Sequence, residues 1–170
     1  MRKVLFIGFL FAYFCGTGLA EYRKKGTIEL GGGLSVGMYE TITPLGTVSV
    51  ERDVITPELG YFLADGFKLG GLLVFESAHG GGLSSENGSI YLTGSYIFNA
   101  STCYPFLQTM IGMANIGDSF ETMDVGIEGG LKLRMGESSL LNIGLRFLSG
   151  SAESFDKMDT VLIAGFTIFR

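Results

Sequence analysis

The stretch MDVGIEGGLKLR, residues 123–134, decides the fold, because its side chains alternate between two kinds. Successive side chains of an extended chain point to opposite faces, so this stretch has one apolar face and one face of charged residues and glycines. The apolar face holds Met123, Val125, Ile127, Leu131 and Leu133. The opposite face holds Asp124, Gly126, Glu128, Gly130, Lys132 and Arg134. This period of two predicts a β-strand that separates two different environments.

The same alternation recurs in residues 27–38 and 141–147, and less cleanly in residues 67–76, where Leu72 and Val74 fall on the polar face. A soluble lipocalin-like barrel turns its apolar face inward, whereas a transmembrane barrel turns it toward lipid. The glycines make the polar face too thin to cover a solvated exterior, and they suit a narrow lumen. We therefore predict the transmembrane arrangement.

Composition agrees with this orientation. The chain is 46% hydrophobic, with a mean hydropathy of +0.38, yet beyond its first twenty residues it has no apolar run of the length that a spanning helix needs. Its 27 glycines are more than twice the usual share of about 7% and are poor material for helices. A closed sheet resolves the conflict, because its apolar residues occupy alternate positions and its backbone groups are all paired.

The first twenty residues predict export. Arg2 and Lys3 precede an apolar run over residues 4–14 and a small-residue segment that ends at Ala20, the pattern of a secretory signal peptide cut before Glu21. The apolar run is too short for a retained helical anchor. We expect a signal peptide at 1–20, a short periplasmic leader at 21–26 and one barrel domain at 27–170, located in the cell outer membrane.

Removal of the signal would have two consequences. It would leave 10 of the 12 basic residues against 17 acidic ones, a net charge of −7 that gives no reason to expect nucleic acid as a partner. It would also leave Cys103 as the only cysteine, so no intramolecular disulfide can stabilise the fold.

Turn signals define the number of strands. Short polar breaks near Asp65, Ser101 and Gly136 recur about every 35 residues, close to one hairpin per interval. Longer connections rich in Gly, Ser, Asp, Glu and Asn are expected at 40–47, 77–87, 115–121 and 149–158. The runs between them are 27–38, 52–62, 67–76, 89–98, 104–114, 122–134, 138–148 and 159–169. The fold class predicted is all-β, an eight-stranded antiparallel up-and-down transmembrane β-barrel with short periplasmic turns and longer outer loops.

Two segments leave details open. Pro57 removes a ladder donor inside a predicted strand, and we expect a β-bulge near residues 51–53. The last strand can be read in two phases, with either Val161, Ile163, Gly165, Thr167 and Phe169 outward, or Leu162, Ala164, Phe166 and Ile168 outward.

The stretch TPELGYFLADGFKLG, residues 56–70, and Tyr104-Pro105-Phe106 resemble the eight-stranded OmpA/OmpX-type outer-membrane barrels. The resemblance covers nearly all of the chain after the signal and implies a fold without an activity. It implies outer-membrane lipids, lipopolysaccharide and the barrel-assembly machinery as partners of a monomer. That machinery is thought to recognise a terminal aromatic residue, whereas here Arg170 follows Phe169.

Charged residues on the small-residue face are the principal candidate site. An eight-stranded barrel is only wide enough for side chains to fill, so lumenal charges must pair. We expect a salt-bridge plug with four members in the periplasmic half and Glu76 and Arg146 nearer the outside; a narrow pore for ions or small solutes is the alternative. The predicted network is Glu29, Glu58, Lys68, Glu76, Glu128, Lys132 and Arg146, of which Glu29, Glu58, Lys68 and Lys132 form the periplasmic half.

Aromatic residues gather near the tight turns and the C-terminus, where they would form an interfacial girdle. The predicted periplasmic girdle is Tyr61, Phe67, Tyr96, Phe98, Tyr104, Phe106 and Phe169, with Phe62 and Phe166 nearby.

Catalysis is not expected. Glu76, Ser77 and His79 invite comparison with a lipid hydrolase at the barrel rim, but the chain continues into Gly80-Gly81-Gly82, a poor support for triad geometry. One histidine and one remaining cysteine are too few for a metal centre, and no cofactor is expected. The hypothesis is a structural or surface-interaction role, with a pore as the alternative and a lipid-modifying enzyme less favoured.

Overall fold

The computed structural model describes residues 22–43, 46–80, 83–99, 103–116, 122–152 and 155–170, so the expected signal peptide lies outside the described residues. Within these ranges the chain forms eight strands. They are β1 (Ile28–Thr43), β2 (Gly46–Ala64), β3 (Phe67–Gly80), β4 (Leu83–Ile97), β5 (Cys103–Ile116), β6 (Thr122–Arg134), β7 (Ser139–Ala152) and β8 (Phe155–Phe169).

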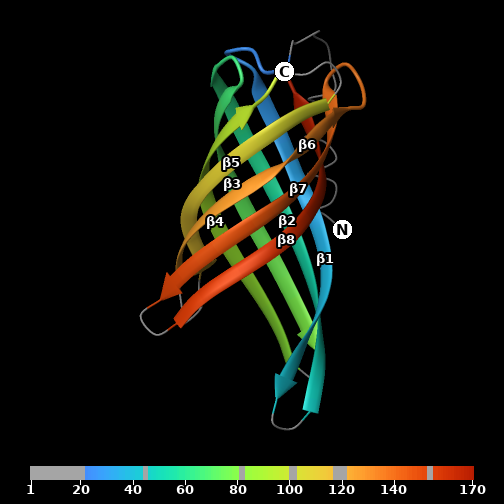
Figure 1. Ribbon diagram of the computed structural model, residues 1–170, viewed down its shortest axis with the longest axis vertical. Coiled ribbons are helices and arrows are strands. Elements are labelled where there is room, and N and C mark those ends of the chain that lie inside the picture. The colour runs from blue at the N-terminus through green and yellow to red at the C-terminus, as the bar shows by residue number, and fades with distance from the viewer. Residues whose placement is uncertain (1–21, 44–45, 81–82, 100–102, 117–121, 153–154) are drawn as a thin grey trace, which may run out of the picture.

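The strands close into a single antiparallel barrel in which each strand pairs with its neighbours in sequence (Figure 1). β1 and β8 close the barrel with six register pairs, from Glu29↔Phe169 to Leu34↔Ala164. The predicted fold class is therefore confirmed. No helix in the described part of the chain is long and apolar enough to cross a membrane.

The two ends of the barrel differ. The end that holds Tyr22, Arg170 and residues 65–66, 98–99 and 135–138 is called the terminal end, and the opposite end is called the distal end. At the terminal end Asp65 and Gly66 alone connect β2 to β3, and Gly66 takes a φ of +82° that favours glycine.

At the distal end the strands extend further than predicted. β1 continues to Thr43 and β2 begins at Gly46. The hairpin that they form projects beyond the neighbouring strands (Figure 1). The expected loops at 40–47, 77–87 and 149–158 are thus largely strand. Antiparallel pairing satisfies the backbone in water as well as in lipid, so a polar composition does not end a strand there.

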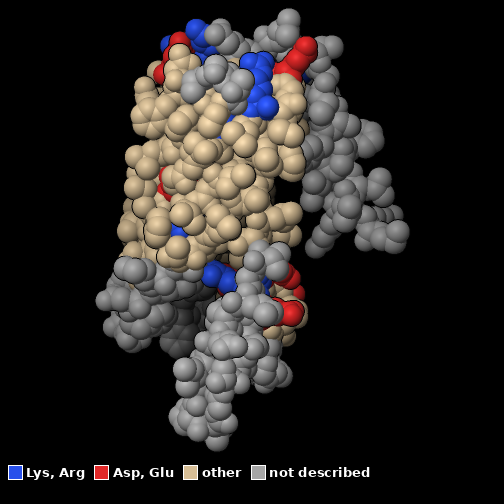
Figure 2. Space-filling model, turned by 45° about the vertical axis from the view of Figure 1, so that its right-hand side comes forward, with Lys and Arg blue, Asp and Glu red and all other residues tan. Residues whose placement is uncertain are grey.

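Alternation separates two environments as the sequence predicts. On β6, Ile127 and Leu131 are 43% and 44% exposed on the outer wall, whereas Glu128 and Lys132 are only 7% and 4% exposed. On the face drawn in Figure 2, the middle of the wall is mostly free of charged residues, and most blue and red atoms lie near the two ends. The polar face therefore points into the lumen.

The structure settles both details that the sequence left open, the bulge in β2 and the phase of β8. The expected bulge at residues 51–53 is wrong, because β2 pairs with β1 and β3 without a shift there. Shifts occur instead between Phe62 and Ala64 and between Gly88 and Ile90. In β8 Leu162 and Phe166 are exposed and Ile163 and Thr167 are buried, so the second phase is the observed one as far as Phe166. Ile168, which that phase also places outward, is buried.

Candidate functional site: the filled lumen

An ion cluster lies in the lumen toward the terminal end. Lys68 of β3 places its Nζ 2.5 Å from Glu29 Oε1 of β1 and 2.7 Å from Glu58 Oε1 of β2. Lys132 of β6 reaches the same Glu29 oxygen at 2.9 Å. Four strands thus bring together the four residues expected in this half of the barrel. Glu29 is the centre of the cluster because it accepts from both lysines.

Glu128 and Arg146 form a second pair further along the lumen. Arg146 Nε and Nη2 lie 2.8 and 2.7 Å from Glu128 Oε2. Glu76, which the sequence placed near Arg146, instead accepts from Arg52 Nη2 at 2.7 Å, and both side chains are about one-fifth exposed near the distal end. Arg52 was missed because its segment was read as a bulge.

Further polar side chains line the lumen outside these ion pairs. Ser95 Oγ donates to Gln108 Oε1 at 2.5 Å, and Asn142 Nδ2 donates to Thr167 Oγ1 at 2.6 Å. The carboxylate of Asp124 accepts from the hydroxyls of Tyr91 and Thr122, at 3.1 and 2.7 Å. None of these residues was included in the predicted charge network, although each falls on the polar face of its strand.

Part of the lumen is apolar. Leu72 and Val74, the residues that blurred the polar face of their segment, are buried inside the barrel. They pack with residues from three other strands in a layer between the Glu128 pair and the distal end. The members of this layer are Val54, Leu72, Val74, Tyr91 and Met110, with Leu148 against it.

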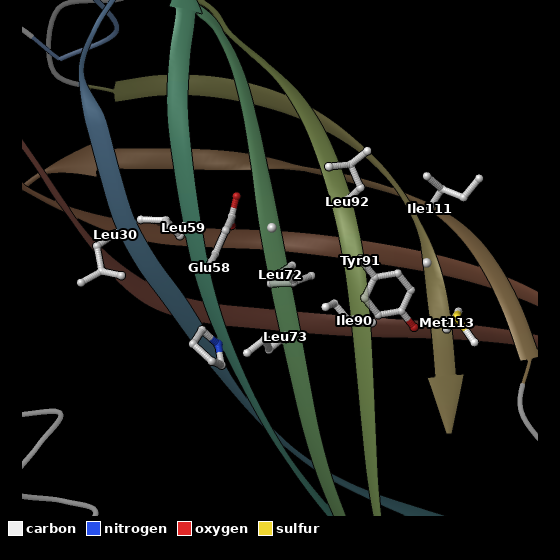
Figure 3. Close-up of a pocket in the computed structure, with 13 residues that line it drawn as sticks. Leu30, Glu58, Leu59, Leu72, Leu73, Ile90, Tyr91, Leu92, Ile111 and Met113 are labelled. Carbon is white, nitrogen blue, oxygen red and sulfur yellow. The ribbon is translucent and has the colours of Figure 1, made fainter. Parts of the chain in front are cut away.

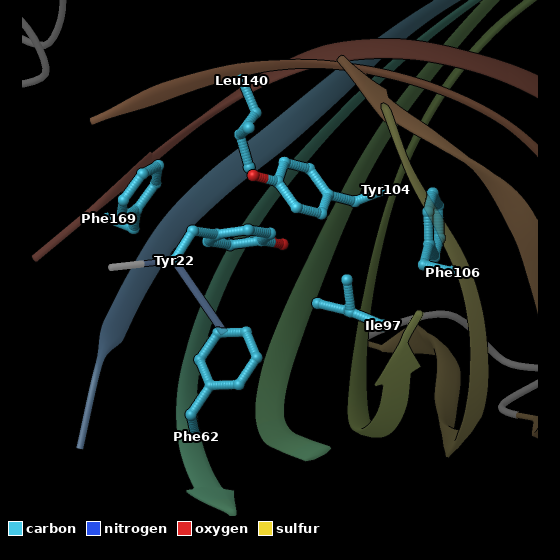
Figure 4. Close-up of a cluster of buried hydrophobic side chains, with 7 residues drawn as sticks. All are labelled: Tyr22, Phe62, Ile97, Tyr104, Phe106, Leu140 and Phe169. Atoms are coloured by element: carbon cyan, nitrogen blue, oxygen red, sulfur yellow. The ribbon is translucent and has the colours of Figure 1, made fainter. Parts of the chain in front are cut away.

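A second apolar cluster closes the terminal mouth (Figure 4). Its centre is Tyr22, whose ring lies 5.6 Å from that of Phe62, 5.1 Å from that of Tyr104 and 4.8 Å from that of Phe169. The full cluster is Tyr22, Phe62, Ile97, Tyr104, Phe106, Leu140 and Phe169.

This cluster corrects the predicted girdle. Tyr61, Phe67, Tyr96 and Phe98 lie exposed on the outer wall near the terminal turns. Tyr104, Phe106 and Phe169 are buried in the lumen instead, because the phase of β5 and β8 turns them inward, where they fill the space around Tyr22. Sequence composition located these aromatic residues at the correct end but assigned three of them to the wrong face.

The segment before β1 holds Tyr22 in place. Tyr22 donates its hydroxyl to Glu29 Oε2 at 2.8 Å, so the aromatic cluster is joined to the ion cluster. Burial and the adjacent Glu29 carboxylate raise the pKa of Tyr22 well above its usual value. Arg23 Nε donates to the Ile97 carbonyl at 2.9 Å, and Lys25 N donates to Asp65 Oδ1 at 2.9 Å. Three of the described residues in the expected leader are therefore bonded to the barrel.

Glycines make room for the lumenal charges. A Cβ on Gly60 would overlap the alkyl chain of Lys68, and a Cβ on Gly150 would overlap the carboxylate of Asp124. Each glycine lies on an inward face opposite a long or charged side chain. This explains why the polar face of the sequence alternates charged residues with glycine.

Comparisons with solved structures give the fold a context. The chain is 16% identical to the N-terminal β-barrel domain of OprF from Pseudomonas aeruginosa, with a TM-score of 0.60 over 86% of this chain and 98% of that one. Neisserial surface protein A is 15% identical, with a TM-score of 0.59 over 85% and 97%. The outer membrane protein OprG from P. aeruginosa is 14% identical, with a TM-score of 0.55 over 87% and 97%.

The chain has the eight-stranded outer-membrane barrel fold. No protein-family model and no curated protein matches the sequence. At these identities the similarity shows the fold alone, so the role of the barrel has to be argued from its own residues.

The rim of this outer-membrane barrel fold does not assemble the catalytic group considered from the sequence. Ser77 Oγ and His79 Nδ1 are 3.2 Å apart and exposed, on the outward face of β3. Glu76 points to the opposite face and accepts from Arg52. Among the described residues, no group of three or more His, Cys, Asp or Glu side chains could hold a metal ion. Cys103 is a free cysteine, half-buried at the start of β5.

The wall of the barrel has a shallow apolar depression of about 520 Å³ across β1 to β5 (Figure 3). Its floor includes Gly71, which lies between Leu59 and Leu92 in the register and leaves open space where a side chain would be. The exposed side chains around it are apolar, so the depression belongs to the apolar band of the wall.

Proposed function

We propose that this protein is an exported outer-membrane barrel whose lumen is closed by its own side chains and whose role is structural or surface-interacting. Outer-membrane lipids and lipopolysaccharide are its proposed surroundings, the barrel-assembly machinery its proposed partner during insertion, and a monomer its proposed state. The terminal end then faces the periplasm and the distal end faces outward, as is usual for such barrels.

The observation that carries this proposal is the division of β6. Ile127 and Leu131 lie on the outer wall, and Glu128 and Lys132 lie in the lumen. Exposing an apolar wall of this kind to water is unfavourable, whereas contact with the acyl chains of lipids is favourable. Exposed aromatic residues at the terminal end, among them Tyr61 and Tyr96, are placed to meet the membrane interface.

The order of layers along the lumen supports closure over transport. From the terminal end the lumen holds the Tyr22 aromatic cluster, the Glu29 ion cluster, the Glu128–Arg146 pair and the Leu72 apolar layer. An ion crossing the barrel would have to break buried ion pairs and pass two apolar layers, and each step is unfavourable.

Two measurements on the protein purified in detergent test the proposal. Unboiled and boiled samples should migrate differently on a gel, and identical migration would contradict a stable barrel. In planar bilayers the protein should give no steady conductance. An Arg146→Ala variant, which removes one of the side chains that close the lumen, is the matched sample for comparison. Steady current through the unmodified protein would favour the pore.

A further inference from the structure

We infer that the lumen contains a specific binding site for one water molecule between Gln108 and Asn142, in the polar layer that the two ion-pair groups enclose. The inference rests on lumen geometry and is independent of the role proposed above. It concerns the region between the Glu29 cluster and the Glu128–Arg146 pair.

A small cavity defines the site. It has a volume of about 20 Å³, and its walls include Gln108, Asn142, Glu58 and Glu128. A single water molecule needs roughly 10–15 Å³ of such space together with two to four polar partners. The cavity is therefore large enough for one water and too small for a sugar, a glycerol or a hydrated ion.

Two residues that line this cavity each have a buried polar atom without a partner among the described residues. Gln108 is only 2% exposed, and its Nε2 has no hydrogen-bond partner among the described residues; the same is true of the buried Oδ1 of Asn142. The other end of each amide is occupied, since Ser95 donates to Gln108 Oε1 and Asn142 donates to Thr167. One donor and one acceptor thus remain on two residues that line the cavity.

Water is the simplest species that satisfies both groups. It accepts from Gln108 Nε2 and donates to Asn142 Oδ1, and it would serve equally well if either amide were turned over, because it both donates and accepts. Leaving the two amide groups buried without a partner would be unfavourable, because each has lost its hydrogen bonds to solvent.

Charge balance argues against an ion. The charged residues in the cavity wall are Glu58 and Glu128 on one side of the balance and Lys132 and Arg146 on the other, so their formal charges cancel. Each is already bonded to an opposite charge. An added cation or anion would be buried without a counter-charge, which is strongly unfavourable.

The wall of the cavity also offers the water a third partner. Glu58 and Glu128 each use one carboxylate oxygen in an ion pair, which leaves the other oxygen of each as a further acceptor. After donating to Asn142 the water has one hydrogen left, which it can donate to the second oxygen of one of these two carboxylates.

Hydration NMR on the barrel in nanodiscs tests the site. Gln108 is the only glutamine in the sequence, so its side-chain amide protons give one assignable pair of signals. A direct cross-peak between these protons and water is expected. The backbone amide of Phe62, which is buried and bonded to the Thr27 carbonyl at 3.0 Å, is the matched control and should show none. Absence of the Gln108 cross-peak would overturn the inference.

Crystals of the barrel distinguish the possible occupants. A single density peak within hydrogen-bond distance of both Gln108 Nε2 and Asn142 Oδ1, without anomalous signal after soaking in rubidium bromide, would support water. An anomalous peak in the cavity would identify an ion and overturn the inference. A direct Gln108–Asn142 bond with no peak would overturn it too, because the cavity would then have closed.

Discussion

Glu128 of β6 lies directly opposite Arg146 of β7, and two nitrogens of the guanidinium approach the same carboxylate oxygen, at 2.8 and 2.7 Å. Both side chains are buried in the lumen. A buried ion pair adds little net stability compared with a well-packed apolar pair, but the loss of one partner leaves an uncompensated charge. The consequence is a large asymmetry between single and double substitutions.

Glu128→Leu and Arg146→Leu should each lower the free energy of unfolding by about 3–5 kcal/mol, and the double variant should lose less than either single variant. The physical reason is that only the single variants bury an unpaired charge. Urea unfolding of the protein in lipid vesicles measures all three. Additive losses would show that the two residues do not act as a pair.

The geometry of the Glu29 cluster predicts which of two substitutions destabilises the barrel more. Glu29 Oε1 accepts from Lys68 and Lys132, whereas Glu58 accepts from Lys68 alone. Glu29→Gln should therefore destabilise the barrel more than Glu58→Gln, because it leaves Lys132 without its carboxylate and removes one of two from Lys68. The midpoints of urea unfolding give the order. Equal midpoints, or the reverse order, would contradict a cluster centred on Glu29.

Many of the residues that line the lumen can be predicted from the alternation of side chains along each strand. The segment at 122–134 was bounded correctly, and alternation alone placed Glu128 and Lys132 inside, because a strand between lipid and lumen cannot exchange its faces without burying charge in acyl chains. The same argument found the four residues of the terminal half of the lumen. Their pairing with one another needed only the narrowness of an eight-stranded barrel.

The partner choices and the aromatic cluster could not be obtained in this way. Which strand positions lie opposite one another depends on register, so Arg52 and not Arg146 pairs with Glu76. Tyr104 and Phe106 were assigned by composition, although Gln108 on the same face of β5 could have indicated that this face is lumenal. Tyr22 lies outside any alternating run, so nothing in the pattern marked it.

Substitutions at Tyr22 separate its two contributions. Tyr22→Phe removes the hydrogen bond to Glu29 and should cost about 1.5–3 kcal/mol, the range for a bond to a charged group. Tyr22→Ala also removes the ring from between Phe62 and Phe169 and should cost about 3–5 kcal/mol in total. Thermal unfolding followed by gel migration compares the two variants. No loss in either would show that the mouth is closed without Tyr22.

The bond between Lys25 and Asp65 should depend on pH. The backbone N–H of Lys25, with Lys24 adding to its effect, lowers the pKa of Asp65 below its usual value of 3.8. A lowered pKa in the folded state means that the contribution is present above the unfolded pKa and is lost as the pH falls through the folded one. The amide signal of Lys25 in NMR spectra should therefore shift only below about pH 4.

An Asp65→Asn variant is the control for that titration, because the amide cannot ionise. In this variant the Lys25 signal should not move over the same acidic range. A Lys25 shift that persisted in Asp65→Asn, or one that occurred near neutral pH in the unmodified protein, would mean that another group titrates at this turn.

Two glycines on different faces test how the barrel closes. Gly165 of β8 lies opposite Gly33 of β1, and a Cβ added to it would overlap the Gly32 carbonyl oxygen, a backbone atom that cannot move aside cheaply. Gly71 of β3 faces outward, and a Cβ there would have no neighbour nearer than 4.0 Å. Gly165→Ala should cost about 1–3 kcal/mol by overpacking, and Gly71→Ala should be near neutral.

The fraction of protein that reaches the heat-modifiable form after refolding measures this difference. Six register pairs join β1 to β8, so a substitution at Gly165 acts on the seam that makes the sheet a closed barrel. Gly165→Ala should reduce the folded fraction, while Gly71→Ala should match the unmodified protein. If both variants folded equally well, the close approach of β8 to β1 would not limit closure, and the seam would have to be held by the Phe169 contacts around Tyr22 instead.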